Sequence, residues 1–330
     1  MNQPWLSVVL PTYNGASYLA QALDSIVLQQ DPEVEVVAVD DGSTDETAAI
    51  LATYAGRLPL QIVRRDHAGN WVESTNLGLS LARGAYACVL HQDDYWLPER
   101  LSVLKPLLYQ CPEAVLALHP SWYVDGQDRR LGLWRCPLPA GDGLLPSRLV
   151  VPRLLVQNFI AMPAPIFRRQ AALDGGGMRP HLWYTADWDL WLTLAAVGPI
   201  FYCPRPLACF RVHGQSQTIR SSVSSQRFRD QLDEVLDRHV RRWEEAHGEL
   251  PGTVRRAAQF SVEMNTTLAA HFHGQRGLLP RLLARGLLLG PAATLRYLRD
   301  SRLAERASSR LRALATPRAS AASRRSHNGA

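Results

Sequence analysis

Short apolar segments alternate with amphipathic segments along the first 90 residues of the chain. The apolar segments span residues 6–10, 34–39, 60–63 and 85–90, and the first segment between them places Leu19, Leu23 and Ile26 on one face of a helix. Strands that alternate with helices at this spacing predict an α/β fold with a mostly parallel, Rossmann-like sheet flanked by helices. The fourth apolar segment has no charged residue, which is typical of a central strand covered on both faces.

Two adjacent carboxylates follow the fourth segment, in the run His91-Gln92-Asp93-Asp94. Ligands of open α/β sheets bind at the carboxyl ends of the strands, so these side chains are expected at a ligand site. Adjacent carboxylates repel each other unless a cation lies between them and a phosphate ligand. The pattern therefore predicts a divalent metal that holds a diphosphate. A solvated turn is the alternative, because short carboxylate motifs also occur by chance.

The loops after the first two strands narrow the class of nucleotide-binding protein. Residues 11–15 read Pro-Thr-Tyr-Asn-Gly, which matches neither the G-x-G-x-x-G of dinucleotide dehydrogenases nor the G-x-x-x-x-G-K-[ST] of P-loop proteins. Tyr13 is suited to stack on a base, and Asp41, at the end of the second strand, is suited to accept a hydrogen bond from a ring N–H. A packed rim aromatic and a simple turn are the alternatives at these two positions.

Three segments together resemble the successive signatures of family 2 glycosyltransferases, and the resemblance covers about residues 5–215. They are Ser7–Gly15, Val39–Asp45 and His91–Pro98, and they occur in that family's order and spacing. The resemblance implies a GT-A fold. It also implies the transfer of a sugar, with inversion of the anomeric centre, from a nucleotide-diphospho-sugar to a saccharide or lipid-linked saccharide. Such transfers build cell-surface polysaccharides, O-antigens and other glycoconjugates.

The resemblance further implies which residues bind the donor and a divalent metal, Mn²⁺ or Mg²⁺. The implied metal ligands are Asp94 and His213. The implied nucleotide-binding residues are Pro11, Thr12, Tyr13, Asn14, Asp41, Asp93 and Arg211. One position departs from the Asp-x-Asp-Asp run of many members, because His91 stands at its first place. Imidazole can ligate manganese or bond to a phosphate, so a direct-ligand role and an orienting role both stay open for His91.

A helix is expected to begin near Ala186, with Leu190, Trp191 and Leu194 on its apolar face. Asp187 lies in the first turn, where the helix dipole stabilises a carboxylate. By resemblance, Asp187 is the catalytic base that takes the proton of the acceptor hydroxyl, and Ala186 replaces the glutamate that usually precedes it. Asp189 is the alternative base, although residues two apart in a helix point to different faces.

The sequence predicts a glycosyltransferase domain over residues 1–220, with a nucleotide-sugar half (1–110) and an acceptor half (111–220). Within the acceptor half we expect a turn at Asp125-Gly126, an irregular loop over residues 136–152 and a strand over residues 158–167. The run Gly175-Gly176-Gly177 is either a mobile loop or a helix stop. Residues 221–315 predict a helical extension, and residues 316–330, rich in Ser, Ala and Arg, predict a disordered tail.

Positive charge is concentrated at the end of the chain. Residues 281–330 hold eleven arginines against two acidic residues, a net charge of +9, whereas the whole chain carries +6. The C-terminal helices are therefore expected either to pack on the sheet domain or to lie on an anionic membrane with their arginines at the headgroups. The chain starts without the pattern of a secretory signal, and the apolar stretch 286–295 is too short to span a bilayer. We expect a cytoplasmic protein, either free or peripheral at the inner face of the membrane, with no specific nucleic-acid partner.

Two other functions stay open. A catalytically silent nucleotide-sugar-binding module is compatible with His91 and Ala186. A nucleotidyltransferase would be expected to carry a glycine-rich loop with Lys or Arg after its first strand, and residues 11–16 do not have this composition. The five cysteines form no C-x-x-C pair, which favours reduced thiols over structural zinc.

Overall fold

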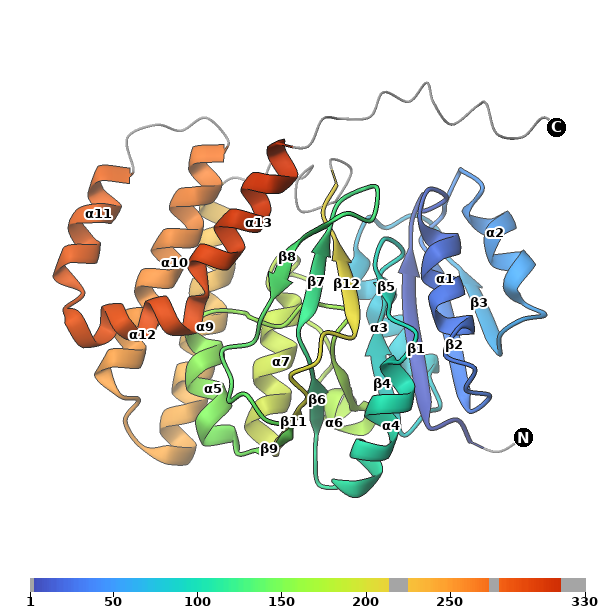
Figure 1. Cartoon of the computed structure of the whole chain (residues 1–330), viewed down its shortest axis with the longest axis horizontal. Coiled ribbons are helices and arrows are strands. Elements are labelled where there is room, and N and C mark those ends of the chain that lie inside the picture. The colour runs from blue at the N-terminus through green and yellow to red at the C-terminus, as the bar shows by residue number, and fades with distance from the viewer. Residues whose placement is uncertain (1–2, 214–224, 273–278, 316–330) are drawn as a thin grey trace.

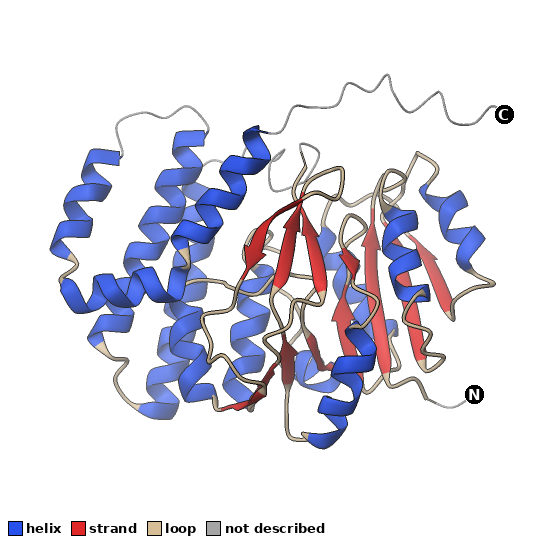
Figure 2. Ribbon diagram, viewed as in Figure 1, coloured by secondary structure: helices blue, strands red, loops and turns tan. Residues whose placement is uncertain are grey.

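An eight-stranded sheet runs through the molecule, and helices cover both of its faces (Figures 1 and 2). The structure is a computed structural model that describes residues 3–213, 225–272 and 279–315. The strand order is β3-β2-β1-β4-β10-β6-β11-β9. In that order the strands are β3 (Leu60–Arg64), β2 (Val34–Asp40), β1 (Leu6–Thr12), β4 (Tyr86–Val89), β10 (Ile166–Arg168), β6 (Leu116–Leu118), β11 (Ile200–Tyr202) and β9 (Gly143–Leu145).

The first half of this sheet is parallel throughout. β1 lies between β2 and β4 and pairs in parallel with both, while β10 runs antiparallel to β4 and to β6. β6 and β11 return to a parallel pairing, and β9 closes the far edge in the antiparallel sense. The predicted α/β fold with a mixed, mostly parallel sheet is confirmed, and the four strands expected in the first 90 residues are β1 to β4.

Both faces of the central strands are buried, as their apolar composition predicts. Tyr86, Cys88 and Leu90 belong to one apolar core, and Ala87 and Val89 belong to the other. The first core is completed by α1 (Leu19–Val27), α2 (Thr47–Tyr54) and α4 (Arg100–Gln110). The second is completed by α3 (Trp71–Leu81), α5 (Ser147–Val156), α6 (Arg169–Asp174) and α7 (Ala186–Val197).

A second, four-stranded sheet lies beside the carboxyl end of the main sheet, and the sequence did not predict it. Its order is β5-β12-β7-β8, made of β5 (Tyr95–Trp96), β12 (Ala208–Arg211), β7 (Ser121–Val124) and β8 (Arg130–Trp134). β12 pairs antiparallel with β5, placing Cys209 opposite Tyr95. The end of β12 therefore lies next to the residues that precede β5. The turn expected at Asp125-Gly126 joins β7 to β8 and is confirmed.

Two expectations for the acceptor half were wrong. Residues 136–152 are not an irregular loop, because β9 and the start of α5 lie within them, and α5 continues past Pro152. Residues 158–167 are mostly not a strand, since β10 begins only at Ile166. The glycine run is the helix stop: Gly176 and Gly177 have φ of +87° and +67° just beyond the end of α6, a conformation that glycine adopts without strain.

The C-terminal extension packs on the sheet domain rather than standing apart from it. It consists of α9 (Ser225–His247), α10 (Gly252–Phe272), α11 (Leu279–Leu288), α12 (Pro291–Ser301) and α13 (Leu303–Ala315). Leu232 and Val235 of α9 and Val254 of α10 share one apolar core with α5 and α7. None of the helices in the described ranges is long and apolar enough to cross a membrane. The predicted tail, residues 316–330, lies outside the described residues.

Asp189 joins the extension to the sheet domain through a buried ionic contact. It lies in the first turn of α7 and is 1% exposed. Its carboxylate accepts hydrogen bonds from Arg238 Nη1 at 2.9 and 3.0 Å and from His239 Nε2 at 2.8 Å, both on α9, and Arg179 Nε lies 3.4 Å away. Both oxygens of this carboxylate are therefore engaged, mainly by side chains of α9.

Asp189→Ala is expected to lower the free energy of unfolding by about 3 kcal/mol, because it leaves Arg238 and His239 without their anion at a buried site. Chemical denaturation measures this change. Asp233→Ala is the matched control, since Asp233 pairs with Arg229 on α9 where the two side chains are 46% and 40% exposed, and this substitution should cost less than about 1 kcal/mol. Equal losses in the two variants would contradict the anchoring role of Asp189.

Candidate active site

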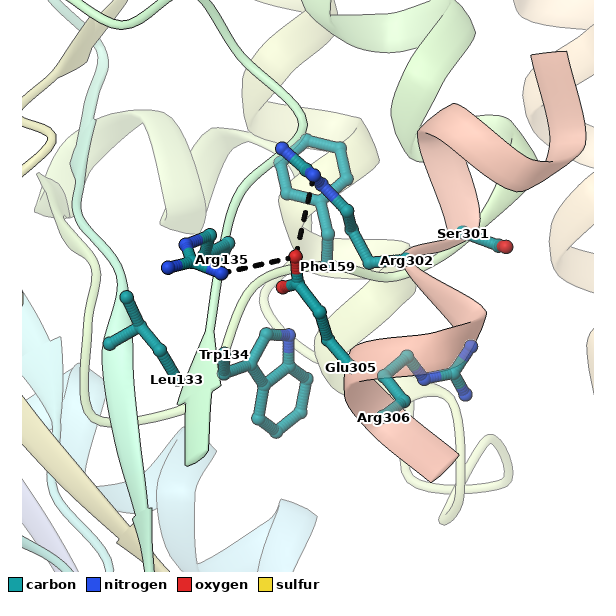
Figure 3. A pocket seen from close by; sticks show the side chains of 8 residues that line it. All are labelled: Leu133, Trp134, Arg135, Phe159, Ser301, Arg302, Glu305 and Arg306. Atoms are coloured by element: carbon teal, nitrogen blue, oxygen red, sulfur yellow. Dashed lines mark hydrogen bonds and ion pairs between the residues drawn. The ribbon is translucent and has the colours of Figure 1, made fainter. Parts of the chain in front are cut away.

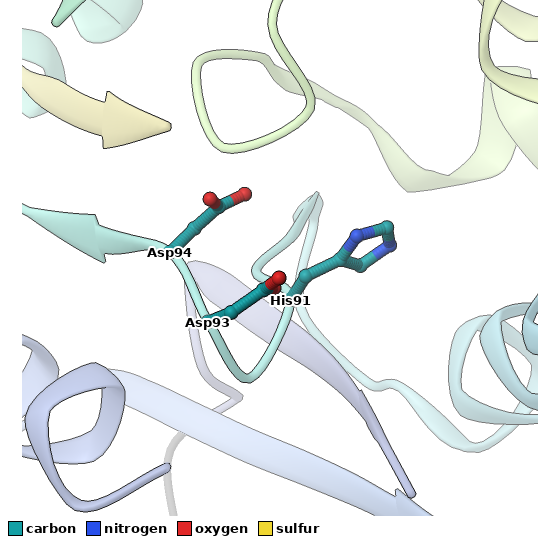
Figure 4. A group of neighbouring side chains, drawn as sticks. All are labelled: His91, Asp93 and Asp94. Atoms are coloured by element: carbon teal, nitrogen blue, oxygen red, sulfur yellow. The ribbon is translucent and has the colours of Figure 1, made fainter. Parts of the chain in front are cut away.

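The turn after β4 brings three possible metal ligands together. Leu90 N donates to Val9 O at 3.0 Å at the end of the strand, and His91 O then accepts from Asp94 N at 3.1 Å. The ligand atoms of His91, Asp93 and Asp94 all lie within 4.8 Å of one another (Figure 4). One short turn at the end of a buried central strand thus forms the whole group.

Two polar atoms of this group are buried and have no hydrogen-bond partner among the described residues, namely Asp94 Oδ2 and His91 Nε2. The other oxygen of Asp94 accepts from Arg211 N at 2.9 Å. Burial, and then the charge of Asp93, raise the pKa of Asp94 well above its usual value. Leaving a buried carboxylate oxygen unpaired is costly, and a divalent cation bound at Asp94 Oδ2 would satisfy it and favour the ionised carboxylate. The residues therefore fit a metal ion.

His91 has the protonation state that a metal ligand needs. Burial lowers its pKa, so the imidazole is neutral at physiological pH and its ring nitrogen can coordinate. The edge of its ring contacts Trp71 in α3, with ring centroids 5.1 Å apart. Of the two roles left open for His91, this geometry favours the direct ligand.

Asp93 and His213 form a hydrogen-bonded pair beside the group. Asp93 Oδ2 lies 3.0 Å from His213 Nε2, and the ring of His213 contacts Tyr18. Burial raises the pKa of Asp93, but the hydrogen bond from His213 and the electrostatic influence of the two neighbouring imidazoles outweigh it, and the net shift is downward. His213, expected as a metal ligand, lies one hydrogen bond outside the three-residue group. Asp93, expected to contact the nucleotide, lies within it.

Arg211 is buried beneath the turn, at 2% exposed, and does not point outward. Its guanidinium donates to Asp93 O at 2.8 Å, to Asp125 O at 2.9 Å and to Gln21 Oε1 at 2.6 Å, and it pairs with Asp128 at 2.7 Å. All three guanidinium nitrogens are engaged by the protein. The geometry thus favours a role in holding the Asp93-Asp94 turn over the expected contact with the diphosphate.

The loop after β1 is tied to the loop after β2 and to the turn after β4. Asn14 N donates to Ser43 Oγ at 3.0 Å, and Asn14 Oδ1 accepts from Thr44 N at 2.8 Å. Gln92 forms two hydrogen bonds with the backbone of Tyr13, accepting from its N at 2.8 Å and donating to its O at 3.0 Å. Pro11 and Thr12 complete the end of β1. The structure therefore gathers the predicted residues Pro11, Thr12, Tyr13, Asn14 and Asp41 at the same sheet edge as the carboxylate turn.

Asp41 fixes the loop that follows β3. Its carboxylate accepts from Ala68 N at 3.1 Å and Gly69 N at 2.9 Å, and Arg65 Nε lies 3.2 Å away. His67 stacks on Tyr13 with ring centroids 4.1 Å apart and an interplanar angle of 15°. The first, second and third loops thus converge around one aromatic pair.

Asp187 lies in the first turn of α7, as predicted, and its carboxylate is partly available. Oδ1 accepts from Trp188 N at 2.7 Å, and Oδ2 accepts from Asn158 Nδ2 at 2.9 Å. Burial raises the pKa of Asp187 to about 6, against the opposing effect of these two hydrogen bonds. Both oxygens of Asp189 are engaged by Arg238 and His239 of α9, so Asp187 is the carboxylate suited to accept a proton.

Trp71 connects the two centres. Its ring contacts His91, and its Nε1 donates to Trp183 O at 3.1 Å, three residues before α7 begins. Asn70 and Asn76 of the same region also bond to the carbonyls of Pro180 and Met178. The segment that precedes Asp187 is therefore attached to α3, and α3 contacts the group formed by His91, Asp93 and Asp94.

Sequence reasoning missed the residues that support the site. Gln92 was read only as part of a motif, and His67, Trp71 and Asn158 were not singled out. Glutamine between a histidine and two aspartates gives no signal of a backbone clamp on a loop 79 residues away. Only the pairing of β1 with β4 brings them together.

Comparisons with known proteins agree with this geometry. The profile described as "Glycosyl transferase family 2" matches residues 7–158. A Mycobacterium tuberculosis protein described as uncharacterized is 30% identical over 266 residues, which cover 78% of this chain and 80% of the relative. A Rickettsia prowazekii protein described as an uncharacterized glycosyltransferase is 26% identical over 244 residues, or 71% of this chain and 70% of the relative. The chain belongs to glycosyl transferase family 2.

Solved structures show the same fold at low sequence identity. Staphylococcus aureus TarS in complex with UDP-GlcNAc has a TM-score of 0.62 at 19% identity, covering 92% of this chain and 91% of that one. A mannosyltransferase from Pyrobaculum calidifontis in complex with GDP-Man and Mn²⁺ has a TM-score of 0.52 at 17% identity, covering 95% and 88%. The predicted GT-A fold is confirmed.

Asp187→Asn is expected to stabilise the protein at pH 8 by about 1–2 kcal/mol, a value reduced for partial exposure. The pKa of Asp187 rises from an ordinary 3.8 to about 6 on folding, so the folded state holds this proton more tightly than the unfolded state. That stabilisation is complete below pH 3.8 and is lost as the pH rises through 6. Thermal melts of both proteins between pH 4.5 and 8 test this, and a gain that does not shrink toward pH 4.5 would contradict it.

Proposed function

We propose that this chain transfers a sugar from a nucleotide-diphospho-sugar to an acceptor hydroxyl with inversion at the anomeric carbon. Family membership supports glycosyl transfer, and the donor class and the stereochemical course are the proposal. The observation that carries it is the pair of centres joined through Trp71: a metal-type group at the end of β4 and a carboxylate with a raised pKa at the start of α7. Such a site can hold a diphosphate at one centre and accept a proton at the other.

The residues at the end of β4 would hold a divalent ion. Asp94 Oδ2 has no hydrogen-bond partner among the described residues, and His91 and Asp93 offer ligand atoms in the same group, which suits Mn²⁺ or Mg²⁺ together with phosphate oxygens. When bound, such an ion neutralises negative charge on the diphosphate. Arg211 and His213 keep Asp94 and Asp93 in place. The loops around Tyr13 and Asp41 receive the nucleoside, with the Tyr13–His67 pair as the stacking surface.

Asp187 serves as the base in a single displacement. The acceptor oxygen forms a bond to the anomeric carbon, the bond from that carbon to the nucleoside diphosphate breaks, and the hydroxyl proton passes to the Asp187 carboxylate. A pKa of about 6 keeps the group mostly ionised above neutral pH while leaving it basic enough to take a proton. The rate should therefore rise with pH through about 6 and level off above it.

The silent-module alternative has less support. A module that only binds has no need of a buried carboxylate with a raised pKa next to the acceptor side, and such groups cluster at functional sites. Membership of glycosyl transferase family 2 also argues against the nucleotidyltransferase alternative. The pathway is proposed from the resemblance alone: synthesis of a cell-surface polysaccharide or another glycoconjugate.

The acceptor side is proposed to work at a membrane surface, as a lipid-linked acceptor would require. Leu288 at the end of α11 and Leu295 and Leu298 of α12 are 83%, 70% and 54% exposed, and the side chains of Arg285 in α11 and Arg299 in α12 are 61% and 50% exposed. Exposed leucines with flanking arginines suit an anionic bilayer. Co-sedimentation with phosphatidylglycerol vesicles should fall in a Leu288→Ser/Leu295→Ser double variant and not in Leu28→Ser. Equal binding by both variants would contradict this surface.

Turnover of nucleotide-sugars tests the proposed function. We expect slow, Mn²⁺-dependent release of nucleoside diphosphate from UDP-GlcNAc or GDP-mannose, with water as the acceptor. Asp187→Asn should lower the rate by about 10²–10⁴-fold because the base is lost. Asp94→Asn should remove the dependence on Mn²⁺, and Asp233→Asn, outside the site, should behave as wild type.

Thermal shifts with nucleoside diphosphates and Mn²⁺ separate binding from catalysis. Asp187→Asn should keep the wild-type shift, whereas Asp94→Asn should lose it. If the wild-type protein shows the thermal shift but releases no nucleoside diphosphate from any donor, and Asp187→Asn behaves in the same way in both assays, the chain is the silent module instead.

A further inference from the structure

Asn158 is the one side chain from outside α7 that hydrogen-bonds the Asp187 carboxylate within the described residues. Its Nδ2 donates to Asp187 Oδ2 at 2.9 Å, and its own Oδ1 accepts from Ile160 N at 3.2 Å. The second contact fixes which end of the amide faces the carboxylate. A donor aimed at an ionised oxygen stabilises the charged form and selects one rotamer of the carboxylate.

Asn158 belongs to a short irregular segment that the C-terminal helices hold from two sides. On one side, Gln157 Oε1 accepts from Ser261 Oγ and from Asn265 Nδ2 of α10, each at 3.0 Å. Gln157 is 9% exposed and Ser261 is 2% exposed, so these contacts are shielded from solvent. Buried, fully paired polar contacts of this kind rigidify the segment that carries them.

On the other side, Phe159 packs against the start of α13. It lines a small pocket with Trp134 of β8 and with Ser301, Arg302 and Glu305, as Figure 3 shows. Glu305 lies between Arg135, at 3.2 Å, and Arg302, at 3.4 Å. Arg306 of α13 also donates to Asn265 Oδ1 at 3.2 Å, which joins the two sides.

The base and α10 share a cavity of about 50 Å³. Asn158, Thr185 and Asp187 line it from the sheet domain, and Ser261 and Asn265 line it from α10. The extension therefore lines the same cavity as the Asp187 carboxylate. The adjacent residues Gln157 and Asn158 link the two, because Gln157 bonds to α10 and Asn158 bonds to Asp187. The anchoring of Asp189 by α9 fixes the other side of the same helical turn.

We infer that the C-terminal helical extension positions the base: α10 holds Gln157, Gln157 holds the segment, and Asn158 is the positioning residue that orients the Asp187 carboxylate. Asn158 does not touch the reacting atoms. This inference rests on the proposed function for its catalytic meaning, but the contact between Asn158 and Asp187 has a consequence for the protein alone.

The test is a pH titration of Asp187, monitored through the carboxyl ¹³C NMR signals of protein labelled at aspartate. The signal of Asp187 is assigned as the one that is missing in Asp187→Asn. In Asn158→Ala the Asp187 pKa should rise by about one unit, because a hydrogen bond to the charged form is lost. Asn158→Asp, of the same size but negatively charged, should raise it further. A Ser261→Ala/Asn265→Ala double variant should raise it by about half a unit, because the segment is then less well held.

Gln226→Ala is the matched control, since Gln226 is an exposed glutamine of α9 that donates a hydrogen bond to Asp230 of the same helix. Thermal melts show that each variant is folded before it is titrated. A pKa of Asp187 that is unchanged in Asn158→Ala would overturn the positioning role. A double variant that titrates like Gln226→Ala would overturn the part assigned to α10.

Turnover adds a readout that separates the two proposals. In Asn158→Ala the acidic limb of the pH–rate profile should move upward together with the NMR pKa, with donor KM unchanged, whereas a purely structural defect would lower the rate equally at every pH. If Asp187→Asn keeps full turnover, the proposed base is wrong, yet the titration still decides whether Asn158 and α10 set the Asp187 carboxylate.

Discussion

Asp94 is buried in the turn after the central strand β4, with one oxygen bonded to the backbone of Arg211 and the other without a hydrogen-bond partner among the described residues. The site as a whole depends on this constraint. A carboxylate placed there is unfavourable by itself, and its neighbour Asp93 makes it more so, which is why its pKa is raised well above the usual value. The fold tolerates this local cost because β4 is covered on both faces and held by β1 and β10. A functional site that is strained in isolation and satisfied by its ligand fits this arrangement.

The surrounding residues can be understood as support for that turn. All the guanidinium nitrogens of Arg211 bond to backbone carbonyls and side chains around Asp93, and His213 bonds to Asp93 directly. Gln92 clamps the loop after β1, and Trp71 links His91 to the segment before α7. The two chemical centres are thus set by a few contacts between distant parts of the chain, and the C-terminal helices complete them from behind Asp187.

The sequence predicted what is local and missed what is assembled. β4 and its turn were predictable because apolar composition and two adjacent carboxylates lie in one stretch, and the same holds for Asp187 in the first turn of a helix. The second sheet was not predictable, since β5 has only two residues and its partner β12 lies more than a hundred residues later. α5 was missed because Pro146 and Pro152 read as loop residues, although Pro146 precedes the helix and Pro152 is accommodated within it. Arg211 points inward rather than outward because it ends β12, whose pairing with β5 was not predicted.

Diffraction from a crystal soaked with Mn²⁺ and a nucleoside diphosphate, recorded at the manganese absorption edge, tests the central claim most directly. The account predicts one strong anomalous peak within coordination distance of Asp94 Oδ2 and a ring nitrogen of His91, with the diphosphate on its open side. A peak elsewhere, or an Asp94 that still bonds only to Arg211 while the nucleotide is bound, would contradict it.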